Sequence, residues 1–326
     1  MKVLLTGASG FVGSHILDSL RARNCETVLL LRNASNTTFL GPHLSETEIR
    51  LGSVTDPKSL AKATEGISHV IHCAGCTKAL RVSEFYEINR AGTRNVVEAL
   101  NQRAPGVRRL VHISSLAVSG PGTPEKPAKE DAPPRPVSDY GKSKLAAELE
   151  VRERSRTPYT VIRPPAVYGP RDTGFLSLFK AVKHHVLPRP NQNQALSLVY
   201  AKDLAEAVVE CLTHPGAVGK TYFAAGDEVV SGASMASEIA AQMKKWTIPF
   251  PLPSLLLWVV CLVQQALSQL TRRASLLNLQ KYAELRAPGW VCDASKLHRE
   301  IGIACPTGLK QGITQTLDWY RREHWL

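Results

Sequence analysis

The chain has 326 residues, 44% of them hydrophobic, and carries 40 Lys and Arg against 28 Asp and Glu. This length can form one large domain, or a main domain with a smaller lobe, and the composition is ordinary for a soluble globular protein. The formal net charge of +12 would suit nucleic acid, an anionic membrane surface or an acidic small molecule. No dense basic run with interleaved aromatic residues is present, so nucleic acid is not expected as a partner.

Seven scattered cysteines, an odd number, fit reduced thiols in a cytoplasmic protein. Cys73 and Cys76 form a C-x-x-C pair, but no further ligands follow at a spacing that suits zinc, so no metal site is predicted. We favour two small residues that line a loop over a redox dithiol. Met1–Leu5 is too short for a signal peptide, and no segment reaches the ~18–20 uninterrupted apolar residues of a membrane span.

Short apolar runs alternate with amphipathic ones through the first half of the chain. In the first amphipathic run, Val12, Ile16 and Leu20 share one helical face. Asp56 and Pro57 have the form of a helix cap followed by proline at the first helical position. The expected strands are Lys2–Thr6, Thr27–Leu31, His69–Cys73, Arg109–Ser114 and Tyr159–Arg163, and the expected long helices are Phe11–Arg23, Glu84–Gln102 and Asp139–Glu153.

This alternation predicts an α/β fold, a doubly wound parallel sheet covered by helices on both faces. Residues 1–165 would form the sheet, with later strands returning to it. Residues 166–326, where proline and glycine are frequent, would form a smaller and mainly helical substrate-binding lobe. Such a lobe would cover the carboxyl ends of the strands, where ligands of these sheets bind.

A glycine run, Thr6-Gly7-Ala8-Ser9-Gly10-Phe11-Val12-Gly13, joins the first strand to the first helix. Gly7 permits a tight turn, Gly10 lets the backbone approach a pyrophosphate, and Gly13 lets the helix pack close to the sheet. The helix N-terminus then points free N–H groups at the phosphates. The run in this strand-to-helix context predicts a Rossmann-type dinucleotide site. Its predicted cofactor contacts are Gly7, Ser9, Gly10, Phe11, Val12 and Gly13.

The end of the second strand bears on which dinucleotide binds. NAD enzymes usually place Asp or Glu ~20 residues past the glycines, for the ribose 2′-hydroxyl. Here the strand ends in Leu31-Arg32-Asn33, without a carboxylate. Arg32 could pair with a 2′-phosphate, which favours NADP over NAD, although NAD could still bind. The alternative is that Arg32 is only a solvated loop charge.

Tyr140 and Lys144 are four residues apart on one expected helix, so their side chains share a face. A free tyrosine has a pKa of ~10, and a nearby ammonium group favours the phenolate and lowers that pKa. Tyr140 could then act as general acid in ketone reduction and as general base in alcohol oxidation, while Lys144 could also hydrogen-bond the cofactor's ribose. At the end of a strand, Ser115 could orient the substrate oxygen, whereas we expect a structural role for Ser114.

Six ordered motifs across the N-terminal three quarters of the chain resemble those of the extended short-chain dehydrogenase/reductases, in the epimerase/dehydratase superfamily. They are Thr6 to Gly13, His72-Cys73-Ala74-Gly75, Asn89-Arg90-Ala91-Gly92-Thr93, Ser114-Ser115, Tyr140-Gly141-Lys142-Ser143-Lys144 and Arg163 to Arg171.

The resemblance implies roles for several of these residues. It makes Ser115, Tyr140 and Lys144 catalytic, and gives Asn89 the task of holding a water or backbone at the site. It places Cys73, Ala74 and Gly75 beside the cofactor and the backbone of Pro164 to Val167 against the nicotinamide. It also implies dimerisation through the two helices Glu84–Gln102 and Asp139–Glu153.

Two departures from the family pattern matter. Where the family often has an Asp that holds the adenine amino group, this chain has Gly52-Ser53. Ser53 could make a weaker contact there, with Val54 beside it. Sugar-nucleotide dehydratases of this superfamily carry an Asp-Glu pair after the serine position, where this chain has Leu116-Ala117. Neither of those side chains can transfer a proton, which argues against water elimination.

Ile248–Leu270 is unusually apolar, with nine consecutive apolar residues from Leu255 to Val263 and two arginines at 272 and 273. A helix apolar all round with a basic flank suits peripheral membrane contact through 248–273. The alternative is a helix buried over the substrate pocket or against a partner subunit. This segment and the closing Asp318–Leu326 resemble the 3β-hydroxysteroid dehydrogenase-like branch, which implies a lipophilic sterol, steroid or long-chain 3-keto substrate.

These observations predict an NADP-dependent oxidoreductase that interconverts a ketone and a secondary alcohol on a lipophilic small molecule. The first alternative is a nucleotide-sugar epimerase that uses bound NAD(P) transiently. The second is a non-enzymatic protein that binds or senses NADP. We expect a homodimer in the cytoplasm that could lie peripherally at the membrane.

Overall fold

A seven-stranded parallel sheet forms the centre of the computed structural model, which describes residues 1–189, 194–251, 253–271 and 279–326. The strand order is β10-β6-β5-β4-β1-β2-β3, so β1 pairs with β4. The strand order reverses at this pair, and the crevice expected at such a point lies beside the glycine run that follows β1. The predicted doubly wound α/β fold is therefore confirmed. The strands are β1 (Lys2–Thr6), β2 (Glu26–Leu31), β3 (Glu48–Leu51), β4 (His69–His72), β5 (Arg109–Ile113), β6 (Tyr159–Arg163) and β10 (Lys220–Phe223).

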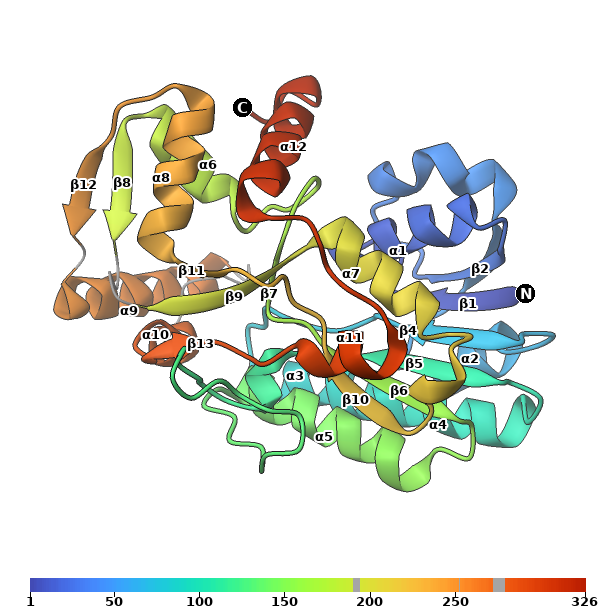
Figure 1. Cartoon of the computed structure of the whole chain (residues 1–326). Coiled ribbons are helices and arrows are strands. Elements are labelled where there is room, and N and C mark those ends of the chain that lie inside the picture. Colours follow the sequence, from blue (N-terminus) through green and yellow to red (C-terminus); the bar gives the residue numbers. More distant parts are fainter. Residues whose placement is uncertain (190–193, 252, 272–278) are drawn as a thin grey trace.

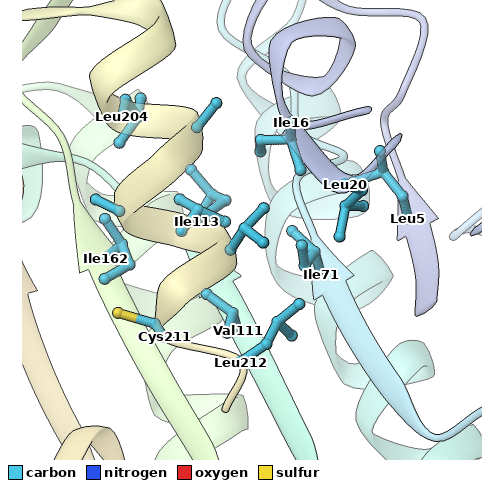
Figure 2. Packing of buried hydrophobic residues seen from close by; sticks show 14 of the residues in the cluster. Leu5, Ile16, Leu20, Ile71, Val111, Ile113, Ile162, Leu204, Cys211 and Leu212 are labelled. Atoms are coloured by element: carbon cyan, nitrogen blue, oxygen red, sulfur yellow. The ribbon is translucent and has the colours of Figure 1, made fainter. Parts of the chain in front are cut away.

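Helices cover both faces of this sheet (Figure 1). On one face α1 (Phe11–Ala22) and α7 (Ala201–Glu210) pack over the strands; Figure 2 shows Ile16, Leu20 and Leu204 meeting strand residues there. On the other face lie α2 (Pro57–Ala63), α4 (Gly92–Arg103) and α5 (Asp139–Arg154). Burial on both faces explains why the strands read as continuous apolar runs.

The predicted helix Glu84–Gln102 is not a single α-helix. It consists of α3 (Val82–Phe85), a π-helical segment η2 (Tyr86–Ala91) and then α4. The π segment contains Asn89, whose side chain is 1% exposed. Such segments often mark functional positions because they re-aim a side chain that a regular helix would direct elsewhere.

The second lobe contains several short strands in addition to its helices, and its role in substrate binding stays a prediction. Its strands are too short to show a period in the sequence. β10 and α7 lie after residue 165 but belong to the central sheet and its covering layer. The lobe strands are β7 (Ala166–Tyr168), β8 (Val186–Arg189), β9 (Ala195–Tyr200), β11 (Val229–Ser231), β12 (Ile248–Pro251) and β13 (Gly289–Trp290).

The lobe has its own apolar core, in which Tyr168, Phe179, Ile239 and Tyr320 are almost fully buried. Its helices are α6 (Leu176–Lys183), α8 (Gly232–Met243), α9 (Ser254–Thr271), α10 (Leu279–Leu285), α11 (Ser295–Ile301) and α12 (Leu309–Arg322). Short 3₁₀ turns are η1 (Thr38–Glu46), η3 (Leu116–Val118) and η4 (Pro215–Ala217).

Helix α9 holds the unusually apolar segment and lies at the end of the molecule far from β1 (Figure 1). Leu257 and Cys261 face inward, at 5% and 0% exposure, but Leu255 is 74% exposed. Most described side chains of this helix are therefore left uncovered, and the helix is not buried over the pocket. Of the helices in the described residues, none combines the length and the apolar content needed to cross a bilayer.

Candidate active site

The glycine turn at the end of β1 has the geometry that a dinucleotide cradle requires. Gly7 adopts φ +77°, and a Cβ there would lie 2.6 Å from the backbone nitrogen of Ala74. A Cβ on Gly13 would lie 2.1 Å from the carbonyl oxygen of Gly7, so glycine lets α1 approach the strand. The structure thus has the tight turn at Gly7 and the close helix contact at Gly13 that the sequence predicted. Cofactor binding by these residues remains a prediction.

A cavity of about 900 Å³ runs from this turn across the carboxyl edge of the sheet. Every site residue predicted from the sequence lines it. They are Gly7, Ser9, Gly10, Phe11, Val12, Gly13, Arg32, Ser53, Val54, Cys73, Ala74, Gly75, Asn89, Ser115, Tyr140, Lys144, Pro164 and Val167.

The start of α5 positions the tyrosine. Ser138 caps this helix, and its hydroxyl accepts a hydrogen bond from the backbone N–H of Gly141 at 3.1 Å. A Cβ on Gly141 would lie 2.6 Å from the carbonyl oxygen of Ala117, so glycine at this position lets the first turn of α5 sit against η3. Tyr140, in that first turn, is thereby brought beside Ser115, the residue that caps η3.

Burial and a hydrogen bond set the state of Tyr140. Removal from water raises the pKa of its phenol to about 12, and the hydrogen bond with Ser115 lowers it only in part. The expectation that Lys144 lowers this pKa below its usual value is therefore wrong for the chain as it stands. The sequence pattern places the ammonium on the right face but does not show how deeply the phenol is buried. At neutral pH the phenol of Tyr140 therefore keeps its proton.

Lys144 lies beneath the tyrosine and is 4% exposed. Its Nζ donates a hydrogen bond to the carbonyl oxygen of Ile113 at 2.7 Å, which ties α5 to the end of β5. Burial lowers the pKa of this ammonium to about 8. At neutral pH the Lys144 ammonium is therefore a cation in the cavity lining, one helical turn after Tyr140.

Asn89 holds backbone at the site, which is one of the two roles that the family resemblance implies. Its Oδ1 accepts a hydrogen bond from the backbone N–H of Cys76 at 2.7 Å, and its Nδ2 donates to the carbonyl of Cys76 at 3.0 Å. The same Nδ2 also lies 2.9 Å from the hydroxyl of Ser143 on α5. Asn89 therefore links the loop after β4 to α5.

Both cysteines of the C-x-x-C pair line the cavity as free thiols. Burial raises the pKa of Cys73 to about 11, so this thiol stays protonated and unreactive at neutral pH. The Sγ of Cys76 donates to the carbonyl oxygen of Lys78 at 2.9 Å. This arrangement supports the favoured interpretation, two small residues lining a loop.

The far end of the cavity, near β2 and β3, is lined by Arg32 and by hydroxyl groups. The backbone N–H of Arg32 donates to Ser35 Oγ at 3.0 Å, and its exposed side chain borders the cavity. The hydroxyls of Ser53 and Thr55 lie 2.9 Å apart. Asp56 instead caps α2 by accepting from the backbone N–H of Lys58 at 3.0 Å, as predicted.

A buried polar cluster links α5 to β6. The carboxylate of Glu148 accepts from Arg163 Nε at 2.8 Å and from Arg163 Nη2 at 2.7 Å. Ser114 donates its hydroxyl to the same carboxylate at 2.6 Å, which gives it the structural role expected from the sequence. Arg163 directly precedes Pro164 and Pro165, so the cluster connects that wall of the cavity to α5.

Several residues at the site were missed by sequence reasoning. Ser35, Lys78 and Glu87 line the cavity, and Glu284 on α10 is close enough to Tyr140 to raise its pKa. Lys78 follows the Cys73-to-Cys76 motif by two residues, so its position gave a weak signal. Glu284 gave none, because it reaches the site only through folding of the second lobe.

A phenol, an ammonium group and a hydroxyl thus meet at the carboxyl edge of a Rossmann sheet, in the same cavity as a glycine cradle. This combination defines an NAD(P)-dependent enzyme of the short-chain dehydrogenase/reductase type. Comparison with known proteins identifies the family. The chain belongs to the NAD dependent epimerase/dehydratase family, whose model matches residues 3–225.

Three curated relatives illustrate the range of this family. A ceramide reductase from Caulobacter vibrioides is 30% identical over 335 residues, covering 99% of this chain and 96% of its own. A UDP-glucose 4-epimerase from Vibrio cholerae is 30% identical over 270 residues, covering 77% and 79%. Sterol demethylase protein B from Methylococcus capsulatus is 26% identical over 336 residues, covering 98% of each chain. Relatives by sequence therefore include proteins named for lipids and proteins named for sugar nucleotides.

Solved structures share the fold at lower identity. The Bordetella bronchiseptica enzyme WbmG in complex with NAD has a TM-score of 0.78 at 23% identity, and the match covers 99% of this chain and 94% of that one. The expected fold class and cofactor class are thus in agreement with the comparisons.

Proposed function

We propose that this protein reduces a ketone, or oxidises the corresponding secondary alcohol, on a lipophilic substrate, with NADP as the preferred cofactor. The observation that carries the proposal is the buried phenol of Tyr140, hydrogen-bonded to Ser115 inside the cavity that also contains the glycine cradle. The hydroxyls of Ser115 and Tyr140 can both hydrogen-bond to one oxygen atom of a substrate, and Tyr140 can supply the proton to that oxygen.

The residues present fit a dinucleotide. A Cβ at Gly7 or Gly13 would collide with backbone, so the chain keeps open the cradle that a pyrophosphate would occupy. Gly7, Gly10 and the N-terminus of α1 would hold the phosphates, and Pro164 and Val167 would flank the nicotinamide. Such a cofactor supplies the hydride when it is bound.

The chain's own groups account for the proton and the orientation. Ser115 would hold the substrate oxygen by a hydrogen bond and turn the carbonyl toward Tyr140. Tyr140 would donate its proton to that oxygen during reduction, and would take it back during oxidation. Lys144, positive and fixed to the Ile113 carbonyl, would stabilise the phenolate that forms. Asn89 would keep the loop at Cys76 in place beside them.

The preference for NADP is supported by the charges around the second ribose. Arg32 borders the cavity there, and of the described lining residues Glu87 alone is acidic. Glu87 belongs to η2, two residues before Asn89 and so at the catalytic end. A 2′-phosphate would therefore meet a guanidinium and hydroxyl groups without a repelling carboxylate.

The small number of described cations at the catalytic end of the cavity supports a lipophilic substrate. The described cations that line the cavity are Arg32, Lys78 and Lys144. Arg32 is at the adenosine end, and Lys144 would stabilise the Tyr140 phenolate. Lys78 is then the remaining described cation of the lining that could bind the diphosphate of a sugar nucleotide. A single cation offers few charge-assisted contacts for that diphosphate. The ceramide reductase that is similar over nearly the whole chain agrees with an apolar ketone.

Nucleotide-sugar epimerisation remains the second candidate, because the Vibrio cholerae relative carries that name. An epimerase would return the hydride to its substrate and show no net cofactor turnover. A protein that only senses NADP would have no need of the Ser115–Tyr140 hydrogen bond, and we do not favour it.

A homodimer is also proposed, through the outer surface of α4 and α5. These helices pack together, and Leu149 on α5 remains 43% exposed. Sedimentation equilibrium tests this: Leu149→Asp should shift a dimer toward monomer, and an unchanged mass would remove this surface as the interface.

The test of the proposed function is NADPH oxidation with a panel of long-chain 3-keto compounds and steroidal ketones, with UDP-sugars as the comparison. Tyr140→Phe should abolish turnover while dinucleotide binding, measured by fluorescence, persists. Tyr86→Phe serves as a matched control outside the cavity lining. Full turnover by Tyr140→Phe, or interconversion of UDP-sugars without net cofactor oxidation, would refute the proposal.

A further inference from the structure

Helix α9 presents a continuous apolar face outward. The side chains that face inward are Leu257, Cys261 and Ser268, at 0–8% exposure, and they recur at helical spacing. The opposite side carries large apolar groups at 40% exposure or more, namely Leu255, Leu256, Trp258, Val259, Leu262, Val263, Leu267 and Leu270. An ordinary surface helix of a monomer is polar on its outer side, so this face calls for a partner.

The strand before α9 extends the same surface. Trp246, Ile248 and Phe250 are 66%, 62% and 51% exposed, and β12 ends three residues before α9 begins. We call these three side chains, together with the eight outward residues of α9, the end face. It combines a tryptophan, a phenylalanine and aliphatic groups, the set that interfacial helices and loops bury among lipid headgroups and acyl chains.

The described charged side chains around the end face are mainly basic. The sequence contains no Asp or Glu between Glu238 and Glu284, and none between Asp172 and Asp203. The structure brings these two acid-free stretches together, because β12 pairs with β8 and α6 packs against α8. Lys180, Lys183, Lys244 and Lys245 are exposed there, and none of them forms an ion pair with a described residue. The described acidic residue nearest in sequence, Glu238, accepts from Gln242.

This charge pattern favours an anionic lipid surface over a second copy of the chain as the partner of the end face. A second copy of the chain, related by a two-fold axis, would bring one lysine-rich rim against an identical one. An anionic headgroup layer instead neutralises the lysines while the acyl chains receive the apolar side chains. The large excess of basic residues over the whole chain, +12, favours the same partner.

We infer that the end face docks on an anionic lipid bilayer, with α9 lying in the plane of the interface and the exposed lysines contacting the headgroups. Since α10 packs against α9 and its Glu284 lies near Tyr140, the docked surface is one helix away from the catalytic phenol. The inference does not depend on the proposed function, because vesicle binding is measured without cofactor or substrate.

Co-sedimentation of the full chain with vesicles tests the inference. Vesicles of phosphatidylcholine mixed with phosphatidylglycerol should bind the protein, and pure phosphatidylcholine should bind it far more weakly. The triple variant Leu255→Gln, Val263→Gln, Leu267→Gln should weaken binding at least tenfold, since each removed side chain would have entered the acyl region. These residues are 74%, 50% and 46% exposed, so folding should survive, which circular dichroism checks.

Two matched controls separate docking from general stickiness. Val218→Gln with Val229→Gln removes two valines of similar exposure, 46% and 47%, outside the end face and should leave binding unchanged. Lys244→Gln with Lys245→Gln should weaken binding to anionic vesicles about fivefold per lysine, because each basic residue near such a surface contributes about 1 kcal/mol. Lys58→Gln with Lys62→Gln on α2, distant in Figure 1, should not.

Three outcomes would overturn the inference. One is no binding to either vesicle type, and another is equal binding of wild type and the α9 variant. The third is a lipid-free oligomer that the α9 variant converts to a smaller species, which would assign the end face to a second copy.

Discussion

Arg163 and Glu148 form two parallel hydrogen bonds, 2.8 and 2.7 Å long, in the buried layer between β6 and α5. Both side chains are nearly inaccessible, at 3% and 0% exposure. Glu148 is one helical turn beyond Lys144, and Arg163 immediately precedes the prolines that line the cavity. The ion pair therefore fixes the spacing between α5, the helix that carries Tyr140, and the wall expected to flank the nicotinamide.

We predict that Glu148→Gln destabilises the protein by roughly 3 kcal/mol, because it leaves a buried guanidinium without its charge partner. Activity should fall further than the loss of folded protein explains. Urea unfolding and kcat measured on the same samples check this. Glu150→Gln is the control, since its partners Arg90 and Arg154 are each 54% exposed. Equal effects of the two substitutions would contradict the positioning role.

The pH dependence of ketone reduction should follow Lys144. Reduction needs the protonated phenol, and with a pKa of about 12 Tyr140 keeps its proton throughout the usual range. The ammonium of Lys144, with a pKa of about 8, loses its proton on raising the pH, and the charge that stabilises the phenolate disappears. The rate of reduction should thus be level up to about pH 7 and fall above about pH 8.

Initial rates across this range check that expectation. Lys144→Met should be slow at every pH and lose the alkaline fall, because no titrating ammonium remains. A reduction rate that climbs as the pH passes 8 would show that the phenolate, not the phenol, is the working form.

Arg32 should decide the choice of dinucleotide. Arg32→Ala should raise KM for NADPH about 10- to 100-fold, since one charge-assisted contact to a phosphate contributes roughly 1.5–3 kcal/mol. KM for NADH should hardly change. Lys58→Ala, on an exposed cation outside the cavity lining, is the control. An equal rise in KM for both dinucleotides would leave Arg32 without a role in selecting NADP.

Two buried histidines on β4 and β5, whose ring centroids are 5.3 Å apart, should make stability sensitive to acid. His72 is hydrogen-bonded at both ring nitrogens, to Thr6 and Thr93, whereas neither nitrogen of His112 has a partner. Burial lowers the pKa of His72 to about 3 and that of His112 well below its usual value. Each neutral ring therefore contributes stability that is complete above about pH 6.5 and is lost as the pH falls below it.

Unfolding free energies at about pH 7.5 and pH 5 should differ by about 2 kcal/mol for each of these histidines. His112→Leu should reduce that difference and cost little at neutral pH, because it removes two unpaired buried nitrogens. His72→Leu should be destabilising at neutral pH, since it strands two threonine hydroxyls. If the two substitutions behave alike, the assigned difference in hydrogen bonding is wrong.

Much of this architecture was predictable where local patterns are strong. The strands Lys2–Thr6 and Tyr159–Arg163 have the bounds expected from their apolar runs, and the glycine run predicted the turn at Gly7. The π segment at Asn89 was not predictable, because it depends on contacts with Cys76 and Ser143 that are distant in sequence. Motifs gave the identity of the site residues but not their environment.

Two further misses have the same origin. The pattern of Tyr140 and Lys144 indicated a lowered pKa for the phenol, yet burial raises it, and burial is a property of the whole fold. The apolar run in α9 suited a buried helix as well as an exposed one, and only the folded lobe shows which side chains are covered.

The central claim is net reduction of a lipophilic ketone, and tracing the hydride tests it most directly. NADPH with both hydrogens at nicotinamide C4 replaced by deuterium would be incubated with the protein and the best ketone of the panel, and the product analysed by mass spectrometry. The account predicts one deuterium on the carbinol carbon for each dinucleotide oxidised, and none with Tyr140→Phe. Deuterium that stays in the dinucleotide pool while a UDP-sugar is interconverted would contradict it.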